Sequence, residues 1–139
     1  MDIIVVGVDG SETAAAAATE AARLAGATGA HHHLVTALVK QKSAVVQVPG
    51  GEWVATTIDQ AEQLLADLAQ RVVSSGVECT KAAVSGKPAE VVVSEAERLG
   101  ASLIVVGNRR MQGAARVFGS VASDVAHHAP CSVYIAKTA

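Results

Sequence analysis

Residues 105–125, VVGNRRMQGAARVFGSVASDV, combine glycines with a Gly-Ser pair that opens an apolar, helix-like run. Glycine has no Cβ, so its backbone can approach an anion closely. If a helix begins near Ser120, the free N–H groups of Gly119, Ser120 and Val121 point out of its positive end, and the Ser120 hydroxyl adds a donor. The stretch from Gly107 onward therefore predicts a phosphate site. Gly-Ser is also a common way to start any helix, and that interpretation stays open.

Other chemical motifs are absent or incomplete. The segment GVDGSE is not G-x-G-x-x-G, and Gly86-Lys87 resembles the end of a Walker A loop but is followed by Pro88. The Asp9 carboxylate could act as a general base, yet no nucleophile and orienting partner accompany it. We interpret Asp9 as a partner for a hydroxyl or for a metal ion carried by a nucleotide, and predict no catalytic residue.

Three consecutive histidines, His31 to His33, suggest a metal site at first sight. Alternate residues of a strand face opposite sides, so only His31 and His33 share a face. Two ligands make a poor zinc site. We therefore predict no metal ligands and interpret the histidines as a solvated strand start.

The elements that must position these residues alternate along the chain. Apolar, β-branched runs predict strands at residues 3–9, 31–39, 77–84, 102–108 and 131–137. Helical patterns lie between them, at residues 11–29, 57–76, 88–100 and 120–128. This alternation predicts one α/β domain over residues 1–139. The fold is a doubly wound, open, five-stranded parallel sheet of strand order 3-2-1-4-5, with helices on both faces.

Two segments carry further expectations. Residues 40–53 contain Pro-Gly-Gly and are predicted to form a loop, in which Trp53 either closes over the core or acts as a lid. The second helix presents one apolar stripe, formed by Ile58, Ala61, Leu65, Leu68 and Val72.

Composition excludes several classes of protein. Of 139 residues, 50% are hydrophobic and 2% aromatic, which suits a buried parallel sheet covered by alanine-rich helices. A net charge of −2 gives no reason to expect nucleic acid or a membrane surface as partner. No apolar run approaches the ~20 residues of a membrane span, and the acidic start is unlike a signal peptide. We interpret Cys79 and Cys131 as reduced and half-buried, in a cytoplasmic protein.

The predicted strand order also places the site. In such sheets ligands bind beyond the carboxyl ends of the strands, where the strand order reverses. That point lies between the first and fourth predicted strands. The loops that begin at Asp9 and Gly107 are therefore expected to share one crevice.

Four segments in order and spacing resemble the universal stress protein family: VVGVDGSETAAAA, GKPAEVVVSEAE, ASLIVVGNRR and GSVASDVAHHAPCSVYI. The resemblance implies the same five-stranded sheet, usually dimerised through the last strand, residues 131–137. It also implies a stress-response sensor or regulator that binds ATP, AMP or cyclic AMP, with or without Mg²⁺, and acts on an unidentified protein partner. Hydrolysis, if any, is expected to be slow, because no catalytic base or Walker lysine is present.

Nucleotide-binding members of the family resemble the pattern G-x2-G-x8 or 9-G-(S/T). Gly107 matches the first glycine, and Gly119 with Ser120 matches the closing pair, but the middle glycine is replaced by Arg110. By resemblance, the nucleotide site comprises Gly7, Val8, Asp9, Ala37, Gly107, Asn108, Arg110, Gly119, Ser120, Val121 and Ala122.

Arg110 leaves two interpretations open. An arginine where the backbone needs a positive φ costs about 1 kcal/mol or more, which favours a dimeric interaction protein of the same family without ATP. If the glycine found at this position in other family members only lets the backbone approach the nucleotide closely, the Arg110 guanidinium could point away from the site or donate to a phosphate. A third hypothesis, an enzyme of the related nucleotide-transfer folds, lacks the extra signature that those enzymes carry near the first loop.

Overall fold

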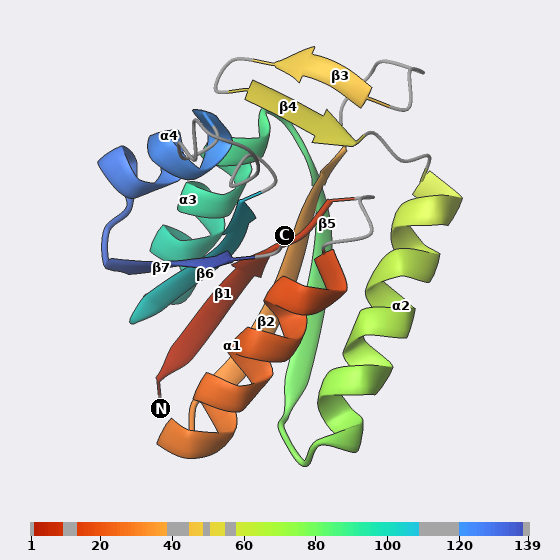
Figure 1. Cartoon of the computed structure of the whole chain (residues 1–139), viewed down its shortest axis with the longest axis vertical. Helices are drawn as coiled ribbons and strands as arrows, with labels where there is room; N and C mark the ends of the chain where they lie inside the picture. The colour runs from red at the N-terminus through yellow and green to blue at the C-terminus, as the bar shows by residue number, and fades with distance from the viewer. Residues whose placement is uncertain are drawn as a thin grey trace.

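The structure is a computed structural model of the chain. It describes residues 2–9, 14–38, 45–48, 51–54, 58–108 and 120–137. Within these ranges the chain forms seven strands and four helices (Figure 1). In chain order they are β1 (Ile3–Gly7), α1 (Ala14–Thr28), β2 (His31–Leu38), β3 (Val45–Val48), β4 (Gly51–Val54), α2 (Ile58–Ser74), β5 (Cys79–Ser85), α3 (Pro88–Leu99), β6 (Leu103–Asn108), α4 (Ser120–His128) and β7 (Ser132–Lys137).

Five of the strands form one parallel sheet in the order β5-β2-β1-β6-β7. In the order of the five predicted strands this is 3-2-1-4-5, so the predicted topology is confirmed. Strand β1 lies at the centre, where the apolar run from Ile3 is paired on both edges and covered on both faces. Long β-branched side chains suit such a strand, because it meets no water on either face.

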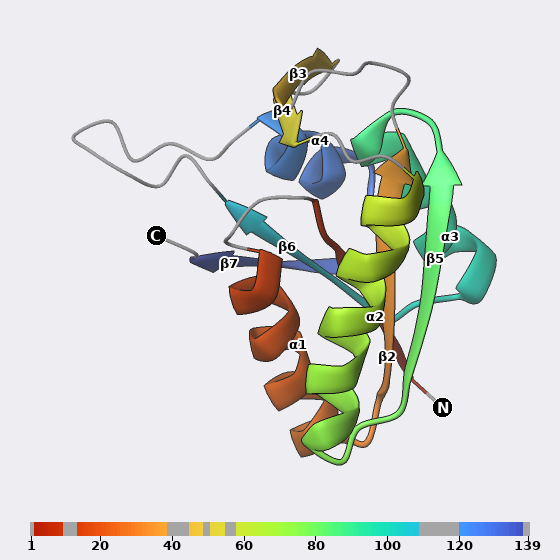
Figure 2. The same ribbon diagram turned by 90° about the vertical axis from the view of Figure 1, so that its right-hand side faces the viewer.

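Helices cover both faces of the sheet, as predicted. Figure 2 shows α1 and α2 on one side of β2 and β5, and α3 on the other. The strand side chains alternate accordingly. Val6 and Leu34 pack in the cluster beneath α1 and α2, whereas Val5 and Val35 pack with α3 and α4. Alanines on the inner face of α1 let that helix approach the sheet closely.

The helix boundaries follow their sequence signals. Helix α3 begins at Pro88 and ends before Gly100, whose φ of 62° is the left-handed conformation that glycine tolerates at a helix end. The stripe predicted on α2 is buried from Ala61 onward. The prediction for Ile58 is wrong, because this first residue of the helix is 64% exposed and the stripe meets the core only one turn later.

The loop predicted over residues 40–53 is wrong for two short segments. Strands β3 and β4 pair antiparallel, with Val45 opposite Val54 and Val48 opposite Gly51. Only two residues separate the two runs, a spacing typical of a hairpin. The hairpin crosses the end of the sheet at which β2 and β5 finish (Figure 1). The lid role weighed for Trp53 depends on a side chain outside the described part of the molecule.

The solvated strand start predicted for the histidines is wrong for His32 and His33. His32 is 0% exposed and His33 is 5% exposed, because β2 is covered on both faces from its second residue onward. His32 Nε2 lies 3.2 Å from the carbonyl oxygen of Ala18 and donates to it. The shared face predicted for His31 and His33 is confirmed, since both rings contact the Thr80 hydroxyl.

Both cysteines are free and half-buried, as predicted. Burial raises the pKa of the Cys79 and Cys131 thiols, which favours their protonated form. Among the helices that the structure describes, none is both long and apolar enough to cross a membrane.

The burial of His32 predicts a pH dependence of stability. Burial lowers the pKa of His32 below its ordinary value of 6.5, so the unfolded chain binds a proton at this position before the folded chain does. The contribution to stability is therefore fully present above pH 6.5 and is lost as the pH falls through the window below it.

His32→Gln should flatten the dependence of the unfolding free energy on pH between 7 and 5, as measured by urea denaturation. His127→Gln, which removes an exposed imidazole instead of a buried one, is the matched control. An unchanged slope in His32→Gln would contradict a protonation cost at this position.

Candidate functional site

The strand order reverses between β1 and β6, as the sequence predicts. Gly7 of β1 pairs with Val35 of β2 on one side and with Val106 of β6 on the other. The chain leaves β1 toward α1 on one face of the sheet and leaves β6 toward α4 on the other face. Open α/β sheets bind ligands at such a reversal, so the predicted crevice would lie between the carboxyl ends of β1 and β6.

The register brings three predicted site residues to the same level. The Val8 N–H donates to the Val35 carbonyl oxygen at 2.9 Å and so continues the β1–β2 ladder by one residue. Extending both registers by two residues from Gly7 sets Asp9 level with Ala37 on one side and with Asn108 on the other. Asp9 is half-buried, and this register sets its backbone between the ends of β2 and β6.

Burial decides which groups of these residues can meet a ligand. The side chains of Val8, Ala37 and Ala122 lie in the core, with exposures of 2%, 0% and 3%. Only their backbone N–H and carbonyl groups can face the crevice. Asp9 and Val121 are half-buried, so their side chains reach its surface in part. Among the predicted site residues whose side chains the structure describes, Val8, Ala37 and Ala122 can therefore offer a ligand only backbone groups, whereas Asp9 can also offer its carboxylate.

Gly7 allows α3 to pack tightly beside the crevice. A Cβ built on Gly7 would lie 2.8 Å from Val92 Cγ2 and 3.3 Å from Val106 Cγ1. Real Cβ atoms do not approach a methyl group as closely as the first of these distances, so the helix can lie at this depth only against glycine. The structure thus shows a packing role for Gly7, the close approach of α3 to β1.

The Thr36 hydroxyl is buried near the same end of the sheet. Thr36 is 0% exposed, and its Oγ1 has no hydrogen-bond partner in the described part of the chain. Thr36 immediately precedes Ala37. Burying a hydroxyl without a partner costs free energy, so the end of β2 retains a hydrogen-bonding group with unmet capacity beside the candidate site.

Helix α4 begins at Ser120, as predicted. Ala122 and Val125 anchor it in the core beneath α3, and the helix contacts β4 and β6. The N-terminus of a helix carries partial positive charge and free N–H groups, which favour an anion such as phosphate. Two predicted site residues, Arg110 and Gly119, lie outside the described residues.

A separate groove runs between α1 and α2, away from the strand ends. Its volume is about 310 Å³, its floor includes Ala22, Val72 and Val77, and Arg23 and Arg71 line its rim. Strand ends contribute nothing to its lining, so it is distinct from the crevice between β1 and β6.

Sequence reasoning did not find Thr36 or the packing of Val92 on Gly7. A threonine within an apolar strand carries no sign that its hydroxyl will be unpaired. The only sequence signal for the close packing of α3 is a glycine at the end of a buried strand. A glycine there is equally typical of a tight turn.

Together these features define an open, doubly wound α/β protein with a crevice at the reversal of strand order. Residues 1–137 match the profile of the Universal stress protein family, and the chain belongs to that family.

Individual relatives agree with this membership. Universal stress protein Sll1388 of Synechocystis sp. is 38% identical over 79 residues, which are 56% of this chain and 51% of that protein. The chain thus spans about half the length of this curated relative.

Solved structures resemble nearly the whole chain. A universal stress protein in complex with cAMP is 25% identical, with a TM-score of 0.77 over 99% of this chain and 98% of its own. The universal stress protein from Archaeoglobus fulgidus in complex with dAMP is 26% identical, with a TM-score of 0.71 over 97% of this chain and 96% of its own.

The contact between Gly7 and Val92 predicts opposite effects for two glycine substitutions. Gly7→Ala should destabilise the protein by about 1–3 kcal/mol, because the new methyl group overpacks a tightly filled site. Gly26→Ala is the control. Its Cβ would lie 3.7 Å from Val77 Cγ2, an ordinary contact, and alanine in a helix should stabilise by about 0.5–1 kcal/mol.

Urea denaturation of both variants measures the difference directly. Equal stability of Gly7→Ala and the parent protein would mean that α3 is free to move away from β1.

Proposed function

We propose that this protein binds an adenine nucleotide in the crevice between the carboxyl ends of β1 and β6 and acts as a nucleotide-dependent sensor or regulator. The pairing of Gly7 with Val106 supports the proposal, because the residues that follow Gly7 and Val106 then leave neighbouring strands at the reversal of strand order. A crevice at that position is where open α/β sheets bind ligands.

The groups at the crevice suit the parts of a nucleotide. The Asp9 carboxylate can accept hydrogen bonds from ribose hydroxyls or hold a metal ion carried by the phosphates. The backbone at Ala37 can flank the base, since its side chain is turned into the core. The N-terminus of α4, from Ser120, offers N–H groups to a phosphate.

The known ligands of similar structures support the same class of molecule. The structures at 25% and 26% identity are complexes with cAMP and dAMP, both adenine nucleotides. We extend this to ATP, with Mg²⁺ as its companion ion, and to AMP as a competing ligand.

The regulatory role rests on what a bound nucleotide can do. A nucleotide favours the conformation that it binds best, and so would change a surface seen by a partner protein. We further propose a homodimer through β7, an edge strand whose open hydrogen-bonding groups a second copy would pair.

Isothermal titration of nucleotide-stripped protein with Mg-ATP tests the proposal. We expect micromolar binding by the parent protein, weakened about tenfold by Ser120→Ala if the hydroxyl donates to a phosphate. Arg110→Gly is the second variant. Binding at least as tight in Arg110→Gly as in the parent would show that the arginine is tolerated and not required.

Failure of the parent protein to bind ATP favours the role of a dimeric interaction protein. Absence of heat in the parent protein, with binding restored in Arg110→Gly, would mean that the arginine closes the site. If sedimentation then showed an intact dimer, the protein would be an interaction module that works without ATP.

A further inference from the structure

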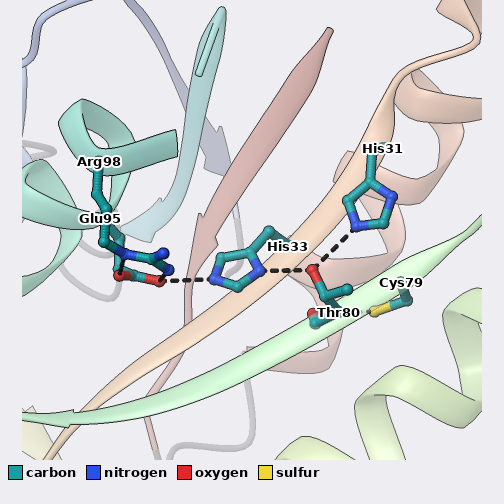
Figure 3. Close-up of polar contacts among 6 residues, drawn as sticks. All are labelled: His31, His33, Cys79, Thr80, Glu95 and Arg98. Atoms are coloured by element: carbon teal, nitrogen blue, oxygen red, sulfur yellow. Dashed lines mark hydrogen bonds and ion pairs between the residues drawn. The ribbon is translucent and has the colours of Figure 1, made fainter. Parts of the chain in front are cut away.

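A chain of polar side chains crosses β2 and β5 on the face covered by α3 (Figure 3). His33 lies at its centre. Its Nε2 is 2.7 Å from Glu95 Oε2, and its Nδ1 is 2.6 Å from Thr80 Oγ1. The same Thr80 oxygen lies 2.9 Å from His31 Nε2. Beyond His31, its Nδ1 is 3.5 Å from Glu78 Oε2.

The two ends of this chain differ in exposure. The side chains of His33 and Glu95 are 6% and 8% exposed, whereas those of His31 and Glu78 are 19% and 79% exposed. One end is therefore enclosed beneath α3 and the other reaches solvent. Thr80 joins them, because it pairs with His33 in the β2–β5 register.

The direction of the hydrogen bond between His33 and Glu95 follows from the charge of the carboxylate. The carboxylate of Glu95 can only accept, so His33 Nε2 must carry a proton and donate. Arg98 donates from Nε and Nη2 to the two oxygens of the same carboxylate, at 2.8 and 3.0 Å. Arg98 first, and His33 after it, lower the pKa of Glu95 although burial raises it, so this carboxylate stays charged.

The remaining hydrogen bonds can run in two directions. When His33 is neutral, its bare Nδ1 accepts from the Thr80 hydroxyl, whose oxygen then accepts from His31 Nε2. When His33 is protonated, its Nδ1–H donates to the Thr80 oxygen, and the Thr80 hydroxyl donates to a bare His31 Nε2. In that second arrangement His31 is neutral and its Nδ1–H faces Glu78.

These two arrangements differ by the passage of one proton. We propose that His31, Thr80 and His33 form a proton relay, which carries a proton from the surface to the buried His33–Glu95 pair. Protonated His31 gives its Nε2 proton to the Thr80 oxygen, and the Thr80 hydroxyl proton passes to His33 Nδ1. One O–H bond breaks as another forms, so Thr80 ends as the neutral hydroxyl it was at the start.

The relay makes the attachment of α3 to the sheet respond to external pH. A proton on His33 turns its bond with Glu95 into one between two full charges, which is stronger than a bond from a neutral ring. The charged or titratable groups that face His33 are Glu95 and Arg98 from α3 and His31 from β2, with Glu78 beyond His31 just before β5. From β1, its register neighbour is apolar Val5.

The relay is separate from the candidate nucleotide site. His33 and Ala37 are four positions apart along β2, about 13 Å at ~3.3 Å per residue. The proposal therefore stands without nucleotide binding. Since Val92 of the same helix packs on Gly7, the proton nevertheless acts on the helix that borders the crevice.

Ring-nitrogen NMR of ¹⁵N-histidine-labelled protein, without nucleotide, tests the relay between pH 8 and 5. At pH 8 we expect His33 as the Nε2–H tautomer. On acidification, the ring signals of His31 and His33 should move together over one shared transition. In Thr80→Val the two rings should no longer move together, because the hydroxyl that joins them is gone.

Two variants control for the loss of a hydroxyl. Thr80→Ser keeps the relay atom and should restore the shared transition. Thr36→Val removes a buried hydroxyl from β2 outside the relay and should titrate like the parent protein. Amide spectra confirm that each variant is folded.

Two results would overturn the relay. His33 signals that stay neutral from pH 8 to 5 while His31 titrates alone would show that no proton reaches the buried pair. Superimposable curves for the parent protein and Thr80→Val would show that the hydroxyl does not couple the rings. The titration of the parent protein decides the first point even if Thr80→Val does not fold.

Discussion

Strand β1 pairs with β2 on one side and with β6 on the other, and this pairing determines where the remaining parts of the candidate site can lie. Gly7 is level with both Val35 and Val106, and the chain leaves β1 toward one face of the sheet and β6 toward the other. The topology therefore predicts a crevice at the carboxyl ends of these two strands. Among the predicted site residues, burial turns the side chains of Val8 and Ala37 into the core, whereas Asp9 is half-buried.

Helix α3 depends on the same central strand. Its Val92 occupies the space that a side chain at position 7 would fill, so the depth of the helix is fixed by the absence of a Cβ. Its other attachment is polar, through Glu95 to His33 of β2. The helix is thus held near the crevice by packing and farther along by charge, and only the second attachment can respond to protonation.

Much of this architecture could be predicted from the sequence, because the signals are local. Continuous β-branched runs mark buried parallel strands, and Pro88 and Gly100 mark the ends of α3. The β3–β4 hairpin was missed although Val45–Val48 and Gly51–Val54 are separated by only two residues, since the Pro-Gly-Gly run was interpreted as a loop.

The histidines show what local reasoning cannot supply. The alternation of a strand correctly put His31 and His33 on one face. Glu95 is the partner that makes burial of His33 possible. It lies 62 residues away in the sequence, and no pattern around the histidines predicts it. For the same reason the sequence predicted which backbone segments meet at the crevice but not the unpaired hydroxyl of Thr36.

The most direct test of the central claim is to titrate ¹⁵N-labelled protein with AMP and follow its backbone amides. We predict saturable shifts at Val8, Asp9, Gly107 and the first residues of α4, with the amides of Ala22 and Arg71 at the α1–α2 groove unmoved. Shifts centred on that groove, or no shifts at millimolar AMP, would contradict a nucleotide site between β1 and β6.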